Sequence, residues 1–473
     1  MTRAVTAPRA FDLGREHGWE PLRVEGALPA DLRGTLYRNG PRRFSDTNAA
    51  HWFDGVGGVA AVRLGGGRAE GAVRLVSTPE VDADRRGRPR YGAFAAKAAW
   101  DKRLAVLFGR RGFKNLANIN VLAWQGRLFA LYEALNPLEL HPETLASLGE
   151  STLGGALRNG FQAHPHRVPE RRATYALGMN IGPGPRCTLD LVELPDQGPA
   201  RRLTTLPLDG VREVHDFAVT ERHAVIVVPP LSAPAWKVAL HGTFAATVTW
   251  DEAAGCEVIV VPLDAPARAR RFKTDAFFAW HWANGWELGD GRIGLDVVRY
   301  EPWTGPWLPP ESVVSGGFPP LAAPPGTRPT LWRATVDPAR ERFELGPLWE
   351  AARCEFPSVA PSQVGARHAA TWLASASADG GPTRDWFDRI ARVDAETGEA
   401  TLFDPGAGRF VGEPVLVERA GGGVWALVMV DEPAARRTHL AIWDGERPGE
   451  PVARCFFDQR LPPDLHGTFV AAA

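Results

Sequence analysis

Short segments of β-strand character follow one another along the whole chain, each closed by glycine, proline or a polar turn, while long helical blocks are scarce. The 50 glycines and 41 prolines are dispersed, which suits many turns and disfavours a disordered segment. Three hairpins are predicted: 120–124 with 127–133, 331–336 with 342–345, and 390–393 with 400–403. This pattern is typical of a β-sandwich, a barrel or a propeller.

The length favours the propeller among these all-β architectures. The chain has 473 residues without a break in composition, which suits one domain over 1–473 with seven blades of roughly sixty to seventy residues each. We find no repeat of the WD or kelch kind. Helix is expected only at 236–247 and as one or two turns at 142–148, so loops and a short helical insertion would cap one face. The Pro/Gly-rich stretch 301–329 is expected to be a lid or rim.

Charge and targeting signals exclude several functional classes. The formal net charge is −1 and no basic block is present, so nucleic acid is not an expected partner. The chain has no secretory signal and no apolar run of membrane-spanning length, and we therefore expect a cytoplasmic protein. The four cysteines lie far apart and form no CxxC pair, which indicates buried reduced thiols: Cys187, Cys256, Cys354 and Cys455.

Four of the twelve histidines are candidate metal ligands. His215 stands where the polar segment 213–216 turns toward the β-branched run 224–228, so its imidazole is expected at the mouth of a strand. The other three are His164, His281 and His466. None has a histidine partner at the spacing of a zinc finger or an HExxH helix. Taken singly, each is more often a structural histidine, but strand starts from different blades of a propeller converge on one axis.

A series of short motifs in a fixed order resembles the carotenoid cleavage oxygenase family, the non-haem iron enzymes that split conjugated alkenes. The matching segments are Leu28–Pro41, His51–Gly55, Ala117–Asn120, Ala163–Pro165, His215–Phe217, Glu355–Pro357, Gly412–Pro414 and His466–Gly467. Each motif is weak alone, but together they cover nearly the full length of the chain. It is this resemblance, and not spacing, that selects the four histidines.

The resemblance implies a seven-bladed propeller that carries Fe(2+) on its axis, held by His164, His215, His281 and His466. It also implies three glutamates that accept hydrogen bonds from the outer nitrogens of three ligands: Glu133, Glu355 and Glu413. Such carboxylates would offset the metal charge, fix the imidazole tautomers and make the ligands more electron-donating. No side chain beyond the metal centre is expected to act as a general acid or base. The alternative for the glutamates is a solvated strand end.

The activity implied is cleavage of one conjugated double bond of a carotenoid or apocarotenoid by O2, giving two aldehydes. Ile119, Tyr132, Trp280 and Trp282 are expected to line the substrate tunnel, with core packing as the alternative for the aromatic residues. Stilbene cleavers of the family have a lysine where this chain has Tyr132, and they pair it with a tyrosine that is absent around 108–110. An apolar polyene is therefore favoured over a stilbene or phenylpropene.

The segment 231–250 resembles the apolar insertion through which family members touch membranes. Carotenoids reside in bilayers, so an enzyme that takes them up needs an apolar mouth. We therefore expect a peripheral membrane contact through 231–250, with a helix that merely caps the propeller as the alternative. From a different functional class, the chain could be a non-catalytic propeller that binds lipids.

Overall fold

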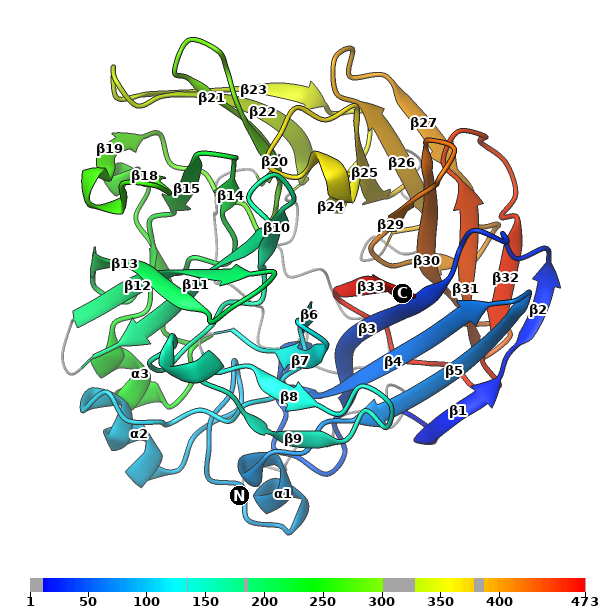
Figure 1. The fold of residues 1–473 in the computed structure, drawn as a ribbon. Helices are drawn as coiled ribbons and strands as arrows, with labels where there is room; N and C mark the ends of the chain where they lie inside the picture. The colour runs from blue at the N-terminus through cyan, green and yellow to red at the C-terminus, as the bar shows by residue number, and fades with distance from the viewer. Residues whose placement is uncertain (1–11, 134, 183–185, 301–327, 378–386, 473) are drawn as a thin grey trace.

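Seven antiparallel sheets stand in a ring around a central axis in the computed structural model (Figure 1). The structure describes residues 12–133, 135–182, 186–300, 328–377 and 387–472. The predicted all-β, seven-bladed propeller is confirmed. That residues 1–473 form one domain stays a prediction, and most of the expected lid or rim at 301–329 lies outside the described residues.

The blades follow the chain in order, and the strands of each are named from the axis outward. Blade 1 has β33 (Gly467–Ala471), β3 (Gly34–Arg43), β4 (Val56–Gly65), β5 (Arg68–Leu75) and β1 (His17–Pro21). Blade 2 has β6 (Asn120–Trp124), β7 (Arg127–Leu131), β8 (Leu138–Leu140) and β9 (Ser147–Glu150). Blade 3 has β10 (His166–Val168), β11 (Ala173–Ile181), β12 (Arg186–Pro195) and β13 (Arg201–Asp209). Blade 4 has β14 (Ala218–Val219), β15 (His223–Val228), β18 (Cys256–Pro262) and β19 (Arg270–Thr274).

The remaining blades repeat this plan. Blade 5 has β20 (Trp282–Glu287), β21 (Ile293–Arg299), β22 (Thr330–Asp337) and β23 (Arg342–Trp349). Blade 6 has β24 (Cys354–Ser358), β25 (Ala370–Ser375), β26 (Arg389–Asp394) and β27 (Ala400–Phe403). Blade 7 has β28 (Phe410–Val411) and β29 (Val415–Glu418), both on β30 (Val424–Glu432), then β31 (Arg437–Asp444), β32 (Ala453–Phe456) and β2 (Arg23–Gly26). All three predicted hairpins are present, as β6–β7, β22–β23 and β26–β27.

The hydrophobic core consists of layers between neighbouring blades. Each of seven clusters of buried residues joins two adjacent blades, and together these clusters complete the circle. The strands therefore bury both faces, as β30 does over all nine residues of 424–432. Since the layers already supply the apolar burial, the ends of the inner strands can carry polar side chains.

The two ends of the chain close the ring. The C-terminal strand β33 pairs with β3 and becomes the inner strand of blade 1, while β2, near the N-terminus, pairs with β32 at the outer edge of blade 7. In Figure 1, β33 lies near the axis beside β3. The register places Gly467 opposite Arg38, immediately after His466. One candidate ligand, His466, therefore lies at the pairing of β33 with β3, the joint that closes the ring.

Helices are few, and the sequence predicted them poorly. α1 (Pro79–Arg85) and α2 (Trp100–Leu107) were not predicted, and the expected helical turns at 142–148 are wrong, because this stretch is a turn that leads into β9. The predicted helix at 236–247 is shorter, as α3 (Ala235–His241). It ends because Gly242 adopts the left-handed conformation with φ of +80°.

Two of the short helices, α2 and α3, lie together beside the ring (Figure 1). α3 packs against α2 through Val106, Ala235 and Val238. The flanking two-stranded ribbon is β16 (Leu231–Ser232) with β17 (Thr249–Trp250). No helix in the described ranges is long and apolar enough to cross a membrane. The four cysteines are buried and free, as expected.

The joint of the ring can be tested at Gly467. A Cβ there would lie 2.1 Å from the carbonyl oxygen of Tyr37, whereas a Cβ at Gly346 in β23 would meet no atom within 4 Å. Gly467→Ala is expected to lower the free energy of unfolding by about 1–3 kcal/mol, because β33 must shift away from β3. Gly346→Ala should leave it nearly unchanged. Urea denaturation of both variants measures the difference, and equal midpoints would contradict this account of closure.

Candidate metal centre

Each candidate ligand lies where the chain enters the inner strand of a blade. His164 precedes β10, His215 precedes β14, His281 directly precedes β20, and His466 directly precedes β33. Inner strands of all blades begin at the same end of the axis, so residues remote in sequence meet there. Near the starts of the inner strands in the other three blades lie Glu355, the second residue of β24, Glu413, between β28 and β29, and Ile119, directly before β6.

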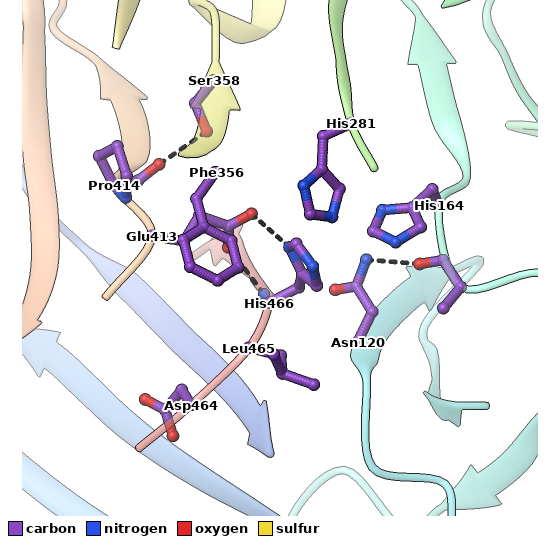
Figure 2. A network of polar contacts seen from close by, with 12 residues as sticks. Asn120, His164, His281, Phe356, Ser358, Glu413, Pro414, Asp464, Leu465 and His466 are labelled. Carbon is purple, nitrogen blue, oxygen red and sulfur yellow. Dashed lines mark hydrogen bonds and ion pairs between the residues drawn. The ribbon is translucent and has the colours of Figure 1, made fainter. Parts of the chain in front are cut away.

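The structure brings the four predicted histidines together. The Nε2 atoms of His164 and His215 are 2.9 Å apart. The ring centroid of His164 lies 4.5 Å from that of His215, 4.8 Å from His281 and 4.6 Å from His466. The His281 and His466 centroids are 4.8 Å apart. Figure 2 shows the rings of His164, His281 and His466 facing one another.

The cluster fits a transition-metal ion. Ring nitrogens of His164, His215 and His281 that could bind a metal lie within 4.8 Å of one another. The Nε2 of His281 is buried and has no hydrogen-bond partner among the described residues, and a metal bond would supply one. The 2.9 Å between Nε2 of His164 and Nε2 of His215 is also the separation of two adjacent ligands at right angles around an ion with bonds of about 2.1 Å. Imidazole ligands suit iron, copper, zinc or nickel.

Burial keeps most of these imidazoles uncharged. It lowers the pKa of His215 to about 4 and that of His164 well below its ordinary value, and in His164 the neighbouring rings add to the effect. Burial also lowers the pKa of His466. For His281 burial acts in the same direction, but the Glu355 carboxylate outweighs it and the pKa is raised. Neutral rings have a lone pair available for a cation.

The three predicted glutamates contact the outer nitrogens of three rings. His215 Nδ1 lies 3.0 and 3.1 Å from the two carboxyl oxygens of Glu133, and His281 Nδ1 lies 2.6 Å from Glu355 Oε2. His466 Nδ1 lies 2.8 Å from Glu413 Oε1, a contact drawn in Figure 2. A hydrogen on Nδ1 leaves Nε2 as the acceptor that faces the cluster.

Each glutamate has a different neighbour. Arg38 lies within the motif Leu28–Pro41, whereas Tyr300 and Glu213 lie outside the matched motifs. The buried Arg38 donates to Glu413 Oε2. Burial acts to raise the pKa of Glu413, but His466 and Arg38 outweigh it, and the pKa is lowered. The phenol of Tyr300 donates to Glu355 Oε1 at 2.7 Å. Glu213 stands beside Glu133 and His215, and burial followed by the Glu133 charge raises its pKa well above the ordinary value.

An apolar cavity of about 370 Å³ opens on the cluster. Its lining includes three of the predicted tunnel residues, Ile119, Tyr132 and Trp280, together with His215, His281 and His466. Trp282 does not line it. The indole of Trp282 is buried against Phe277 between blades 4 and 5, so this residue belongs to the hydrophobic core.

Aromatic rings form one wall of the cavity. Trp280 lies 4.5 Å from the ring of His215, and Phe53 lies 6.4 Å from Trp280. Phe94 follows at 5.3 Å from Phe53, and Phe244 at 5.9 Å from Phe94. Phe244 packs on the α2–α3 contact, so the wall runs from the histidines to these helices. Neither Phe94 nor Phe244 was expected from the sequence to line the cavity: Phe94 lies outside the matched motifs, and Phe244 was covered only as part of the segment 231–250.

Comparisons with known proteins agree with this geometry. A family model described as retinal pigment epithelial membrane protein matches residues 11–471. Apocarotenoid-15,15'-oxygenase of Synechocystis sp. is 32% identical over 470 residues, 94% of this chain and 92% of that protein. Lignostilbene-alpha,beta-dioxygenase isozyme III of Sphingomonas paucimobilis is 26% identical, and the match covers 96% of this chain and 94% of that protein.

A solved structure of similar shape is that of cobalt-substituted Synechocystis ACO. It has a TM-score of 0.86 and 28% sequence identity, and the match covers 98% of both chains. Shape and sequence thus agree over almost the whole length. The chain therefore belongs to the retinal pigment epithelial membrane protein family, which includes the carotenoid cleavage oxygenases, and it is an oxidoreductase of that family.

Proposed function

We propose that the protein is an Fe(2+)-dependent dioxygenase that cleaves one conjugated C=C bond of an apocarotenoid or carotenoid. One alkene and one O2 would give two aldehydes, so both oxygen atoms enter the products and no further reductant is needed. The observation that carries the proposal is a cluster of four imidazoles, three of them backed by carboxylates, at the end of an apolar cavity.

His164, His215, His281 and His466 would hold the ion, and Glu133, Glu355 and Glu413 would orient three of them. A bound ferrous ion would supply the one-electron chemistry that a reaction with O2 requires. The cobalt-substituted relative supports a divalent metal in a protein of this shape. The chain's own contribution is to orient the polyene and exclude water, through the wall of Trp280, Phe53 and Phe94.

An apolar polyene suits the cavity better than a phenolic stilbene. Tyr132 lines the cavity at the position where stilbene cleavers of the family have a lysine, and burial raises its pKa far above the ordinary value, so its phenol stays neutral. The higher identity to the apocarotenoid oxygenase than to the lignostilbene dioxygenase points the same way. Stilbene cleavage is the alternative within the family.

We also propose that the α2–α3 face touches a membrane, and that the protein is cytoplasmic and peripherally attached. Trp100 and Phe108 at the ends of α2 are 63% and 68% exposed, and Trp236 and Leu240 of α3 are 60% and 59% exposed. The cavity wall reaches the same helices. Large exposed apolar side chains on helices that the cavity wall reaches suit uptake of a substrate from lipid. The contact would thus involve α2 as well as 231–250.

Removal of one ligand tests the metal assignment. His215→Ala is expected to lose the metal and at least about a hundredfold in activity while the propeller stays folded. His223→Ala is the matched control, because His223 also pairs with a glutamate, Glu287, at 3.0 Å, but lies outside the cluster. Elemental analysis after anaerobic Fe(2+) loading measures the metal. Full activity in His215→Ala would overturn the assignment, and a wild-type protein that takes up no iron would favour a non-catalytic lipid-binding propeller.

A substrate panel tests the reaction. Iron-loaded protein given β-apo-carotenals, an intact carotene and resveratrol-like stilbenes is expected to convert a polyene into two aldehydes. Mass spectrometry identifies the bond that is cut, and labelled O2 should place one oxygen atom in each aldehyde when exchange with water is limited. Cleavage of the stilbenes alone would replace the polyene proposal by its alternative.

Vesicle binding tests the membrane contact. The double variant Trp236→Ser/Leu240→Ser is expected to partition at least about tenfold more weakly to phospholipid vesicles, because each apolar side chain contributes about 1 kcal/mol or more to insertion. Leu402→Ser serves as control, since Leu402 is 53% exposed on β27 in blade 6, away from α2 and α3. Equal sedimentation of both variants with vesicles would count against this face.

A further inference from the structure

We propose that Tyr300 is a positioning residue of the metal centre: its phenol fixes Glu355, and through Glu355 it fixes the orientation of His281. This inference rests on the proposed function, because it concerns the hold on the ion. Tyr300 is no candidate from the sequence, since it stands 55 residues before Glu355 at the end of an ordinary apolar strand, β21.

The contacts of Glu355 engage both of its carboxyl oxygens. Oε1 accepts the O–H of Tyr300 at 2.7 Å. Oε2 accepts the backbone N–H of Phe356 at 2.6 Å and lies 2.6 Å from Nδ1 of His281. Because Oε2 of a carboxylate has only lone pairs to offer, Nδ1 must carry the hydrogen. Nε2 of His281 is then the acceptor that points into the cluster, in agreement with its lack of a partner within the described ranges.

Tyr300 is well placed to hold this arrangement. It is buried, its backbone N–H donates to the carbonyl of Phe278 at 2.8 Å, and its ring packs on that of Phe278. Burial, followed by the Glu355 charge, raises its pKa well above the ordinary value, so the phenol keeps the proton that it donates. Since Val298 N–H donates to the carbonyl of His281, Tyr300 and His281 belong to the same rigid hairpin, β20–β21.

The backbone at Glu355 also indicates that the orientation of its carboxylate is fixed. Phe356 has a φ of +56°, the left-handed region that a non-glycine residue rarely adopts. The pairing of β24 with β25 shifts register between Glu355 and Ser358. Strain of this kind persists only where the surroundings enforce it, and at this bend it directs the Glu355 carboxylate at His281 and the N–H of Phe356 at that carboxylate.

Loss of the phenol would leave Oε1 of Glu355 buried without its hydrogen-bond donor. The carboxylate would then rotate to regain one, and its hydrogen bond to His281 would lengthen. Tyr300→Phe is therefore expected to bind Fe(2+) and Co(2+) about tenfold more weakly, at the low end of the loss seen when the hydrogen-bond partner of a metal-binding histidine is removed. The cobalt absorption bands should shift, and the folded propeller should remain.

Tyr175→Phe is a close control. The hydroxyl of Tyr175 donates to Glu193 at 2.9 Å, so this variant also loses a buried tyrosine–glutamate bond, but on β11 and away from the histidines. Both variants should lose a similar amount of stability to urea. Anaerobic competition with a chelator measures metal affinity, and we expect a loss only in Tyr300→Phe, not in Tyr175→Phe.

A double-mutant cycle distinguishes the outcomes. If Tyr300 acts through Glu355, then Tyr300→Phe/Glu355→Gln should bind metal no more weakly than Glu355→Gln alone. Metal affinity of Tyr300→Phe within twofold of wild type, or an additive double variant, would overturn the role of Tyr300 and leave the proposed function intact. A wild-type protein that binds neither Fe(2+) nor Co(2+) would instead overturn the proposed function, and this inference with it.

Discussion

Closure of the ring is the constraint on which the rest of the molecule depends. Pairing of β33 with β3 completes blade 1, and the residue that enters β33 is His466. The same joint places Arg38 of β3 against Glu413 of blade 7, which in turn contacts His466. The fourth imidazole and its carboxylate are therefore correctly placed only when the two ends of the chain have met, so the candidate site exists only in the closed propeller.

Burial of so many polar groups at one point requires that their charges and hydrogen bonds compensate one another. Uncharged imidazoles cost less free energy to bury than charged ones, while the carboxylates behind them supply negative charge for a cation. The three carboxylates have different neighbours: the guanidinium of Arg38 beside Glu413, the phenol of Tyr300 beside Glu355, and a second carboxyl, that of Glu213, beside Glu133. Burial raises the pKa of Glu133 to about 8, although a hydrogen bond from Glu213 acts in the opposite direction, whereas the pKa of Glu413 is lowered. The four-histidine cluster is thus electrostatically asymmetric.

What could be predicted from the sequence depended on local signals. Hairpins at β6–β7, β22–β23 and β26–β27 follow from strand runs that flank a turn, and the histidines from short motifs. Tyr300 contacts Glu355, and Glu213 contacts Glu133, only because segments of different blades pack together, which no spacing encodes. Trp282 illustrates the converse, because adjacency to His281 suggested the cavity while strand alternation turned its side chain into the core. α2 lacked a capping side chain and a clear apolar stripe, so pattern alone could not find it.

The residues near the starts of the seven inner strands indicate where a substrate could approach. Four of them are histidines and two are glutamates, whereas blade 2 has Ile119, an apolar side chain that can neither bind an ion nor accept a hydrogen bond. Its carbonyl accepts the N–H of His466, so Ile119 lies directly beside the cluster, and it also lines the cavity. Ile119 and Trp280 line the same cavity, so the ring of polar groups is interrupted where the cavity opens on the cluster. An alkene that enters along Phe94, Phe53 and Trp280 would therefore reach a cavity in which the apolar side chain of Ile119 lies beside the cluster.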